Sequence, residues 1–353
     1  MGFSNSKVIR DFLHAIKDAG IPFQTFDINT RKDVISSDYA DIVTPRKDFN
    51  IRKFTHVVEM FRSPAPELTG ITKARIAFWE GEHGLLDAFP YLASKNPVIA
   101  MSDYNADNFR KELPPSTPVF KIPYPLQRLS SDMDPRDIVR AKYGLGKEDF
   151  VVFYNFDLGS FHRKNPLAAM QAFAKAFANE NKAKLVFKFN LAKDFPDRIA
   201  AINAEARHLG IADRVLSISG YLPQKEIHNL TNACDVYLSL HRAEGFGIGI
   251  AEAMQLGKPV IVTNYSAPTE FCQDKTAFLV SFNMVKINPG EYFTSMETWA
   301  DADVDDAATA LRKCYDNPAY AHAVGENARH FIEDHFSIQN FKKSVTAFLD
   351  AQT

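Results

Sequence analysis

The stretch Arg242-Ala243-Glu244-Gly245-Phe246-Gly247-Ile248-Gly249-Ile250-Ala251-Glu252-Ala253-Met254 decides how this 353-residue chain folds. The apolar run 235–240 before it predicts a buried strand, and the apolar-periodic segment 248–256 predicts a helix. Gly-Lys-Pro at 257–259 ends that helix, and 260–263 predicts the next strand. Strand, glycine turn, helix and strand together predict a βαβ unit.

The same stretch carries groups suited to a ligand with phosphates and sugars. Free N–H groups at the start of a helix form a ready site for phosphate. Glu244 and Glu252 flank the turn, and a carboxylate accepts hydrogen bonds from adjacent sugar hydroxyls. The alternative is that Glu244 is a solvated loop acid and Glu252 an exposed helix acid. Gly245-Phe246-Gly247 argues against it, because glycine allows a ligand close to the backbone at a strand's carboxyl end.

The rest of the C-terminal half alternates strands and helices. The predicted strands are 151–156, 184–189, 215–219, 235–240, 260–263 and 276–280, and the predicted helices are 166–178, 197–209, 224–232 and 248–256. Short apolar strands that alternate with helices indicate a parallel doubly wound sheet. Ligands of such sheets bind at the carboxyl ends of the strands.

The N-terminal half repeats this pattern. Its predicted strands are 23–28, 56–61, 75–79, 97–101 and 118–122, with Ser102 placed to cap the helix after the fourth. Pro123-Tyr124-Pro125 predicts an interdomain linker. We therefore expect an α/β protein with two Rossmann-like domains, 1–125 and 126–336, facing across a cleft that holds the ligand. A last helix in 337–353, predicted over 338–351, is expected to pack back onto the first domain.

The beginning of the chain departs from this pattern. A doubly wound domain normally starts with a strand, whereas this sequence goes straight into a predicted helix over 7–19. We expect either that the first domain lacks its first strand or that the sequence given starts just after it.

Composition excludes several classes of protein. A net charge of −2 gives no basis for binding nucleic acid. We see neither a signal peptide nor an apolar run of membrane-spanning length, so we expect a cytoplasmic protein. The basic pairs Arg46-Lys47 and Arg52-Lys53 are interpreted as solvated surface, with a peripheral membrane contact as the alternative. Three scattered cysteines, at 234, 272 and 314, fit a reducing compartment and argue against a disulfide framework or a zinc site.

Two further turns are expected at the same edge of the second sheet. Arg163 and Lys164 follow its first strand, where two cations could neutralise a diphosphate as it leaves; a solvated basic turn is the alternative. Gly220, Tyr221 and Leu222 follow another strand, where backbone groups and an aromatic ring could hold a nucleobase; an ordinary strand-to-helix turn is the alternative.

Other polar clusters are less specific. Trp79-Glu80-Gly81-Glu82-His83 ends a predicted strand of the first domain and is either functional or structural. Asp301-Ala302-Asp303 contains a D-x-D that could hold a metal ion, but the helix that follows favours capping. His241 and Arg242 either support the ligand or lie at the surface. The sequence contains no GxSxG or Walker motif, so a serine hydrolase or P-loop enzyme has no support.

These residues resemble a known family. Glu244-Gly245-Phe246-Gly247 followed by Glu252-Ala253-Met254 is similar to the E-x7-E motif of family-4 retaining glycosyltransferases. Arg163-Lys164-Asn165-Pro166 resembles that family's basic phosphate-binding turn, and Gly257-Lys258-Pro259-Val260-Ile261 resembles the stretch after its E-x7-E motif. Trp79-Glu80, the strand end at 99–102 and the closing helix look like a subgroup of bacterial polysaccharide mannosyltransferases. The usual family spacing places an arginine at Gly159, whereas Arg163 here adjoins Lys164.

The resemblance implies a GT-B fold and a metal-independent retaining hexosyltransferase without a cofactor. It implies that Glu252 holds the ribose of a nucleotide-sugar donor and that Glu244 contacts the donor sugar. By the same resemblance, backbone amides of Gly247 and Ile248 serve the sugar and phosphates, and Arg163 and Lys164 stabilise the leaving diphosphate. Gly245, Phe246 and the turn of Gly220, Tyr221 and Leu222, expected from their places at strand ends, complete the predicted donor site.

The sequence thus leads to one favoured function. We expect transfer of a sugar, with GDP-mannose as the best guess and a UDP-sugar as the alternative, to a hydroxyl of a glycan or lipid-linked acceptor. A non-catalytic nucleotide-sugar-binding or scaffolding module derived from such an enzyme is the second hypothesis. A nicotinamide dehydrogenase is disfavoured, because no G-x-G-x-x-G follows a first strand.

Overall fold

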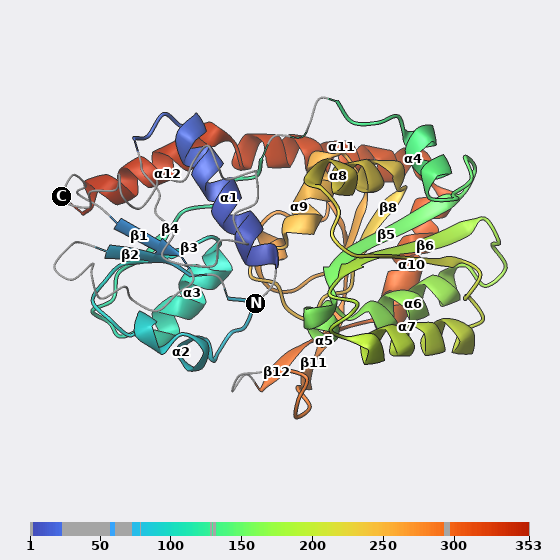
Figure 1. Cartoon of the computed structure of the whole chain (residues 1–353), viewed down its shortest axis with the longest axis horizontal. Coiled ribbons are helices and arrows are strands. Elements are labelled where there is room, and N and C mark those ends of the chain that lie inside the picture. The colour runs from blue at the N-terminus through green and yellow to red at the C-terminus, as the bar shows by residue number, and fades with distance from the viewer. Residues whose placement is uncertain are drawn as a thin grey trace. The chain divides into compact units, whose positions relative to one another are not determined.

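The computed structural model describes residues 3–22, 57–60, 73–77, 79–127, 129, 132–292 and 297–352. The predicted strand 23–28 and the basic pairs at 46–47 and 52–53 lie outside the described residues. The chain divides into two compact units, one made of Met1–Gln127 with Phe336–Thr353 and the other of Arg128–His335 (Figure 1). The sequence predicts these boundaries at 125/126 and 336/337.

The first unit contains a four-stranded parallel sheet in the order β1-β2-β3-β4. Its strands are β1 (Val57–Met60), β2 (Lys73–Ile76), β3 (Val98–Ala100) and β4 (Val119–Lys121), and its helices are α1 (Phe3–Asp18), α2 (Leu85–Ala88), α3 (Asp103–Glu112) and α12 (Ile338–Asp350). Ser102 caps α3 as expected, since its Oγ accepts a hydrogen bond from Asn105 N at 3.1 Å. The four described strands overlap four of the five predicted ones; β2, expected over 75–79, begins two residues earlier and ends at Ile76.

The closing helix α12 belongs to this first unit. Phe341 packs edge-on against Phe12 of α1, with ring centroids 5.2 Å apart. Phe348, near the other end of α12, packs against Phe120 of β4 at 5.1 Å. Edge-to-face pairs of buried rings stabilise such contacts beyond the area they cover. The last residues of the chain therefore complete the core of the unit in which the chain starts.

The second unit is a six-stranded parallel sheet in the order β10-β9-β8-β5-β6-β7. Its strands are β5 (Phe150–Asp157), β6 (Ala183–Asn190), β7 (Val215–Ser219), β8 (Val236–Ser239), β9 (Val260–Thr263) and β10 (Phe278–Val280), all six of them predicted. After β7 the chain crosses back and places β8 on the other side of β5. This reversal is a topological switch point, where doubly wound sheets bind their ligands.

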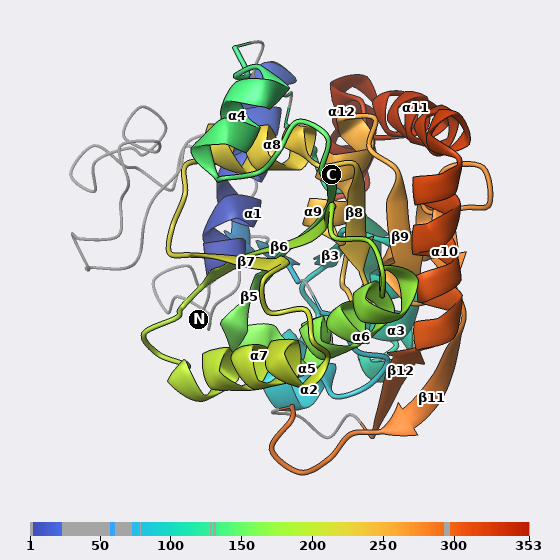
Figure 2. The ribbon, with the colours of Figure 1, turned by 90° about the vertical axis from the view of Figure 1, so that its right-hand side faces the viewer.

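Helices cover both faces of this second sheet. They are α4 (Arg136–Lys142), α5 (Phe161–Lys164), α6 (Pro166–Ala176), α7 (Pro196–His208), α8 (Gln224–Ala233), α9 (Ile248–Gln255), α10 (Val304–Asp316) and α11 (Pro318–His335). Figure 2 shows α4 and α8 on one face and α6 and α7 on the other. The expected α/β class with parallel sheets is therefore confirmed. None of the described helices combines the length and apolar character needed to cross a membrane.

One element of the second unit was not expected. Strands β11 (Phe282–Lys286) and β12 (Thr298–Ala302) form an antiparallel pair. Asp301 and Ala302 lie in β12, so the interpretation of the whole acidic run as the lead-in to a helix is wrong for these two residues. Asp303 does cap α10, because its Oδ1 accepts hydrogen bonds from Asp305 N and Asp306 N, both at 2.9 Å.

Candidate functional site

The candidate site lies at the switch point, where the loops after β5 and β8 meet. The short helix η6 (Leu158–Ser160) and α5 follow β5, and the glycine turn follows β8. Arg242 N donates to Arg163 O at 2.7 Å, which joins the two loops through their backbones. Asn165, with φ of 53°, then turns the chain from α5 into α6. The basic turn and the glycine turn therefore form one structure, as their places at strand ends predicted.

Glu244 is the centre of this structure. Its Oε1 forms an ion pair with Lys164 Nζ, and its Oε2 lies 3.2 Å from Arg163 Nη1. Arg163 Nη1 also donates to Ala243 O at 2.8 Å. The Glu244 residue is only 5% exposed, so its interpretation as a solvated loop acid is wrong.

The electrostatics of Glu244 follow from these contacts. Burial raises the pKa of its carboxyl group, but the charges of Lys164 and Arg163 outweigh burial and lower the pKa to about 2. Glu244 is therefore a carboxylate at pH 7. The two cations and this carboxylate sum to a net charge of +1. The Lys164 side chain remains 20% exposed against 7% for that of Glu244, so the cation is the more accessible partner.

The backbone of Glu244 is also fixed. Its N–H donates to Ser266 Oγ at 2.9 Å, and its carbonyl accepts from Ala267 N at 3.2 Å. Ser266 adopts a φ of 62°, a conformation that few non-glycine residues take. Ser266 is not among the predicted site residues, because a serine just after a buried strand is too weak a signal of such a role.

The glycine turn allows α9 to begin close to its neighbours. Gly247 has a φ of 92°, and a Cβ there would lie 3.0 Å from Pro268 Cγ. A Cβ on Gly249 would lie 2.4 Å from the Tyr237 hydroxyl oxygen. The backbone amides of Ile250 and Ala251 both donate to Gly247 O at 3.0 Å. The N–H groups of the first two helical residues, 248 and 249, have no acceptor among the described residues.

Glu252 lies one turn further along α9 and faces α8. Its Oε1 accepts from Gln224 Nε2 at 2.8 Å and lies 3.5 Å from His228 Nε2. Glu252 is 7% exposed, so the alternative of an exposed helix acid is wrong as well. Gln224 and His228 are not among the predicted site residues, although their four-residue spacing on a predicted helix places them on one face.

The turn at 220–222 precedes α8, whose first residue, Gln224, binds this second carboxylate. Gly220 has a φ of 97°, and its N–H donates to Phe189 O at 3.1 Å. Tyr221 is 61% exposed, and the chain enters α8 directly afterwards at Gln224. Gln224 thus connects the turn to Glu252. The arrangement brings the turn, α8 and α9 together at the carboxyl edge of the sheet.

Two polar residues of the opening motif have structural partners instead. Arg242 binds Asp301 Oδ1 through Nε at 3.0 Å and Nη2 at 2.9 Å, and its guanidinium lies over the ring of Trp299. His241 is fully buried, with Nε2 3.1 Å from Tyr265 O and Nδ1 3.2 Å from Ser239 Oγ. Burial lowers the pKa of His241 to about 4, so the ring is neutral at pH 7. Arg242 therefore fixes the hairpin of β11 and β12 to the site through Asp301, and the interpretation of Arg242 as a simple surface residue is wrong.

The cluster 79–83 in the first unit is tied to its own scaffold. Trp79 is 1% exposed, and its Nε1 donates to His83 O at 3.1 Å. Asn105 of α3 donates to Trp79 O, and Asn108 donates to Gly81 O at 3.4 Å. These bonds account for the tryptophan and the turn without a ligand, which favours the structural interpretation of this cluster.

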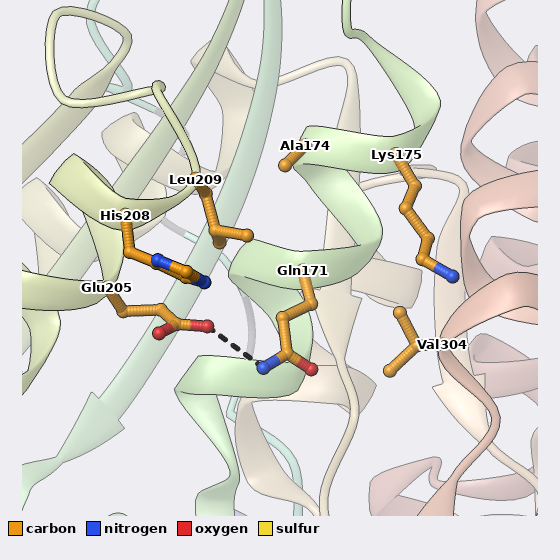
Figure 3. A pocket seen from close by; sticks show the side chains of 7 residues that line it. All are labelled: Gln171, Ala174, Lys175, Glu205, His208, Leu209 and Val304. Atoms are coloured by element: carbon orange, nitrogen blue, oxygen red, sulfur yellow. Dashed lines mark hydrogen bonds between the residues drawn. The ribbon is translucent and has the colours of Figure 1, made fainter.

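A cavity of about 450 Å³ lies elsewhere in the second unit (Figure 3). It is lined by Gln171, Ala174, Lys175, Glu205, His208, Leu209 and Val304. The lining residues of α6 and α7 come from the second halves of these helices, which begin at the carboxyl edge of the sheet and run away from it. None of them belongs to the cluster around Glu244, so this cavity is separate from the candidate site.

Comparisons with known proteins point to the same unit. Residues 136–287 match the family model of glycosyl transferases group 1. The alpha-1,3/1,6-mannosyltransferase ALG2 of Dictyostelium discoideum is 25% identical over 158 residues, which cover 44% of this chain. That match spans 33% of the length of ALG2, about a third of the curated relative.

Solved structures share the fold of this chain over most of its length. A glycosyltransferase from Rickettsia africae ESF-5 has a TM-score of 0.72 at 14% identity, over 99% of this chain and 94% of that one. Anabaena HepE, solved with UDP and glucose, has a TM-score of 0.63 at 18% identity, over 80% of this chain and 72% of that one. Residues 136–287 are therefore similar to glycosyl transferases group 1, and the chain has the GT-B fold that its resemblance implies.

Proposed function

We propose that this chain transfers a sugar from a nucleotide-diphosphate donor to a hydroxyl of a glycan or lipid-linked acceptor, with retention of the anomeric configuration. The observation that carries the proposal is the ion-paired cluster of buried Glu244 with the partly buried Lys164 and Arg163 at the switch point of the second sheet. This cluster lies within the segment that matches glycosyl transferases group 1.

The two cations suit the leaving diphosphate. Lys164 and Arg163 come from the turn after β5 and exceed the charge of Glu244 by one, so the cluster attracts an anion. Negative charge builds up on the diphosphate as the bond to the sugar breaks, and positioned cations stabilise that charge. Because side chains supply this charge, we propose that the reaction requires no metal ion.

Helix α9 suits the remaining parts of the donor. The backbone N–H groups of its first two residues, 248 and 249, follow the glycine turn and have no acceptor among the described residues. Such free N–H groups at a helix N-terminus bind phosphate. Glu252, one turn inside the helix, would accept hydrogen bonds from the ribose hydroxyls in partnership with Gln224. Glu244 would contact the donor sugar near its reacting carbon, and the leaving phosphate would take the proton of the acceptor hydroxyl.

The donor's identity rests on similarity alone. ALG2 is named a mannosyltransferase, which supports a mannose donor, and HepE was solved with UDP, which supports a uridine nucleotide. We propose GDP-mannose as the donor, with a UDP-sugar as the alternative to be tested beside it.

The test is turnover of each donor by the purified protein. We expect release of the nucleoside diphosphate from GDP-mannose or a UDP-sugar, unchanged by EDTA, and a glycosylated product whose anomeric configuration matches the donor by NMR. Lys164→Met should lower turnover by about 100-fold or more, as the loss of a charge-stabilising group in an active site does. Lys175→Met is the matched control, because Lys175 pairs with the exposed Asp305 away from the site.

A non-catalytic nucleotide-sugar-binding module is not favoured by these findings. It would bind nucleotides without turning over any donor, and Lys164→Met would change affinity alone. Tight binding of UDP or GDP with no turnover of several nucleotide sugars, in the presence of simple sugar and glycolipid acceptors, would replace the first proposal by this one.

A further inference from the structure

Strand β6 contains a buried lysine that the proposed reaction does not use. Lys188 stands between Phe187 and Phe189 in an apolar run and is only 2% exposed. Its Nζ donates to Asn190 Oδ1 at 2.7 Å. An ammonium group carries three donors, and the remaining two have no acceptor in the part of the chain that the structure describes.

Such a group is expensive to bury without further acceptors. Burial lowers the pKa of Lys188 to about 8, and the charge of Asp157 opposes that effect. Asp157 itself accepts a hydrogen bond from Gly159 N at 2.7 Å, and the structure shows no hydrogen bond between it and Lys188. A ligand with a hydrogen-bond acceptor at this position would satisfy the ammonium group.

The register of the sheet places Lys188 on the face that α8 and α9 cover. Lys188 stands opposite Asn155 of β5, and Phe153, two residues earlier and so on the same face, stands opposite Tyr237 of β8. The Tyr237 hydroxyl lies against Gly249 at the start of α9. Lys188 therefore shares a face with the start of α9, the helix that carries Glu252.

The order of strands places Lys188 beyond the phosphate end of the site. Lys164 and Glu244 follow β5 and β8, whereas β6 lies on the other side of β5 and β7 lies beyond it. Gly220, in the turn after β7, donates its N–H to the carbonyl of Phe189, the residue after Lys188. A nucleotide with its diphosphate at Lys164 and its ribose at Glu252 would extend its base toward β6 and β7.

We propose that Lys188 donates a hydrogen bond to a carbonyl oxygen of the donor's nucleobase, so that the site accepts guanine or uracil and rejects adenine. The inference rests on the proposed function, because it places a nucleotide at this edge. Guanine and uracil present carbonyl acceptors where adenine presents an amino donor, and lysine is a common partner of guanine O6 and N7. An adenine would set its amino donor against the buried ammonium and leave both without an acceptor.

Isothermal titration calorimetry with GDP, UDP, ADP and inorganic pyrophosphate tests this role. We expect the wild-type protein to bind GDP or UDP at least tenfold more tightly than ADP, a difference of about 1.4 kcal/mol. Lys188→Met should reduce that ratio to about threefold or less and leave the Kd of pyrophosphate unchanged. Lys184→Met is the matched control, because Lys184 occupies the same face near the opposite end of β6, and it should keep the wild-type ratio.

The ratio compares ligands on one preparation, so a partly unfolded variant does not distort it. Lys188→Gln, which keeps a donor, should give an intermediate ratio and serves if the methionine variant does not fold. An unchanged ratio in both Lys188 variants overturns the inference, and so does an equal loss of affinity for all three nucleotides and pyrophosphate. Failure of the wild-type protein to bind any nucleotide refutes the proposed function itself, whereas nucleotide binding without base preference refutes only the role of Lys188.

Discussion

Replacing Lys164 by methionine removes the ammonium nearest to Glu244 and should raise the pKa of that carboxyl group. In the wild-type protein burial raises this pKa, and the charges of Lys164 and Arg163 bring it down from 4.5 to about 2. The difference of about 2.5 pH units corresponds to about 3 kcal/mol of preference for the charged form in the folded state. Lys164 is the largest contributor of the opposing charge, so most of this preference should vanish with it.

The effect must depend on pH in a defined direction. Because the folded pKa lies below the unfolded one, Glu244 stabilises the fold fully above about pH 4.5, and this stabilisation is lost as the pH falls toward 2. At pH 3 the wild-type protein should already have lost about 2 kcal/mol of it. We therefore expect Lys164→Met to lower the free energy of unfolding at pH 7 by about 3 kcal/mol, and at pH 3 by about 2 kcal/mol less than at pH 7.

Urea unfolding at the two pH values measures this difference. The chain has two tryptophans, so a Trp79→Phe background leaves Trp299 as the sole reporter. Trp299 is 1% exposed and lies under Arg242 beside the site. Lys175→Met is the control and should change stability by less than about 0.5 kcal/mol at either pH, because its ion pair is exposed. An equal destabilisation by Lys164→Met at pH 7 and pH 3 would refute the electrostatic reasoning.

Three further predictions concern the surroundings of the cluster. Gly249→Ala should destabilise the fold by about 1–3 kcal/mol, because its Cβ would lie 2.4 Å from the Tyr237 hydroxyl oxygen; Tyr237→Phe in the same chain should relieve part of this loss in urea unfolding, and an unchanged loss would contradict the steric cause. Glu252→Gln should weaken GDP or UDP binding about tenfold in calorimetry and leave pyrophosphate binding unchanged, whereas equal weakening of both would exclude a ribose contact. Arg242→Met should destabilise the fold by about 2 kcal/mol through loss of its contacts to Asp301 without changing the Kd of pyrophosphate, and a weakened Kd would instead make Arg242 a phosphate ligand.

The sequence predicts the second unit well because its elements follow simple local rules. Apolar runs mark the six strands, and proline or glycine marks several helix ends. Parallel strands present all their carboxyl ends at one edge, so Lys164 and Glu244 could be placed together although they are 80 residues apart. What local rules cannot give is the contact itself, since which carboxylate oxygen meets which cation depends on the exact closure of two loops.

Other features depended on contacts that no local pattern encodes. Asp301 stands in an acidic run typical of a helix start, yet it pairs with Asn283 across an antiparallel hairpin and binds Arg242. Tertiary context overrode the local signal there. Gln224 binds Glu252, which is 28 residues away in the sequence. The sequence places Lys188 in a predicted strand and gives no sign that its side chain is buried. The burial of Lys188 depends on the helices that cover both faces of the sheet, and no local sequence pattern encodes that packing.

The presence of Glu244 at a site meant for an anion looks unfavourable at first, because its charge cancels one of the two cations. Without it, however, Lys164 and Arg163 would repel each other in a partly buried place with no counter-charge. The carboxylate gives both cations a counter-charge and holds them in fixed positions while still leaving a net charge of +1. A donor that brings its own diphosphate then meets charges that are already oriented, so that little reorganisation is needed as the leaving group departs. On this argument Glu244→Gln should impair turnover partly by loosening Lys164.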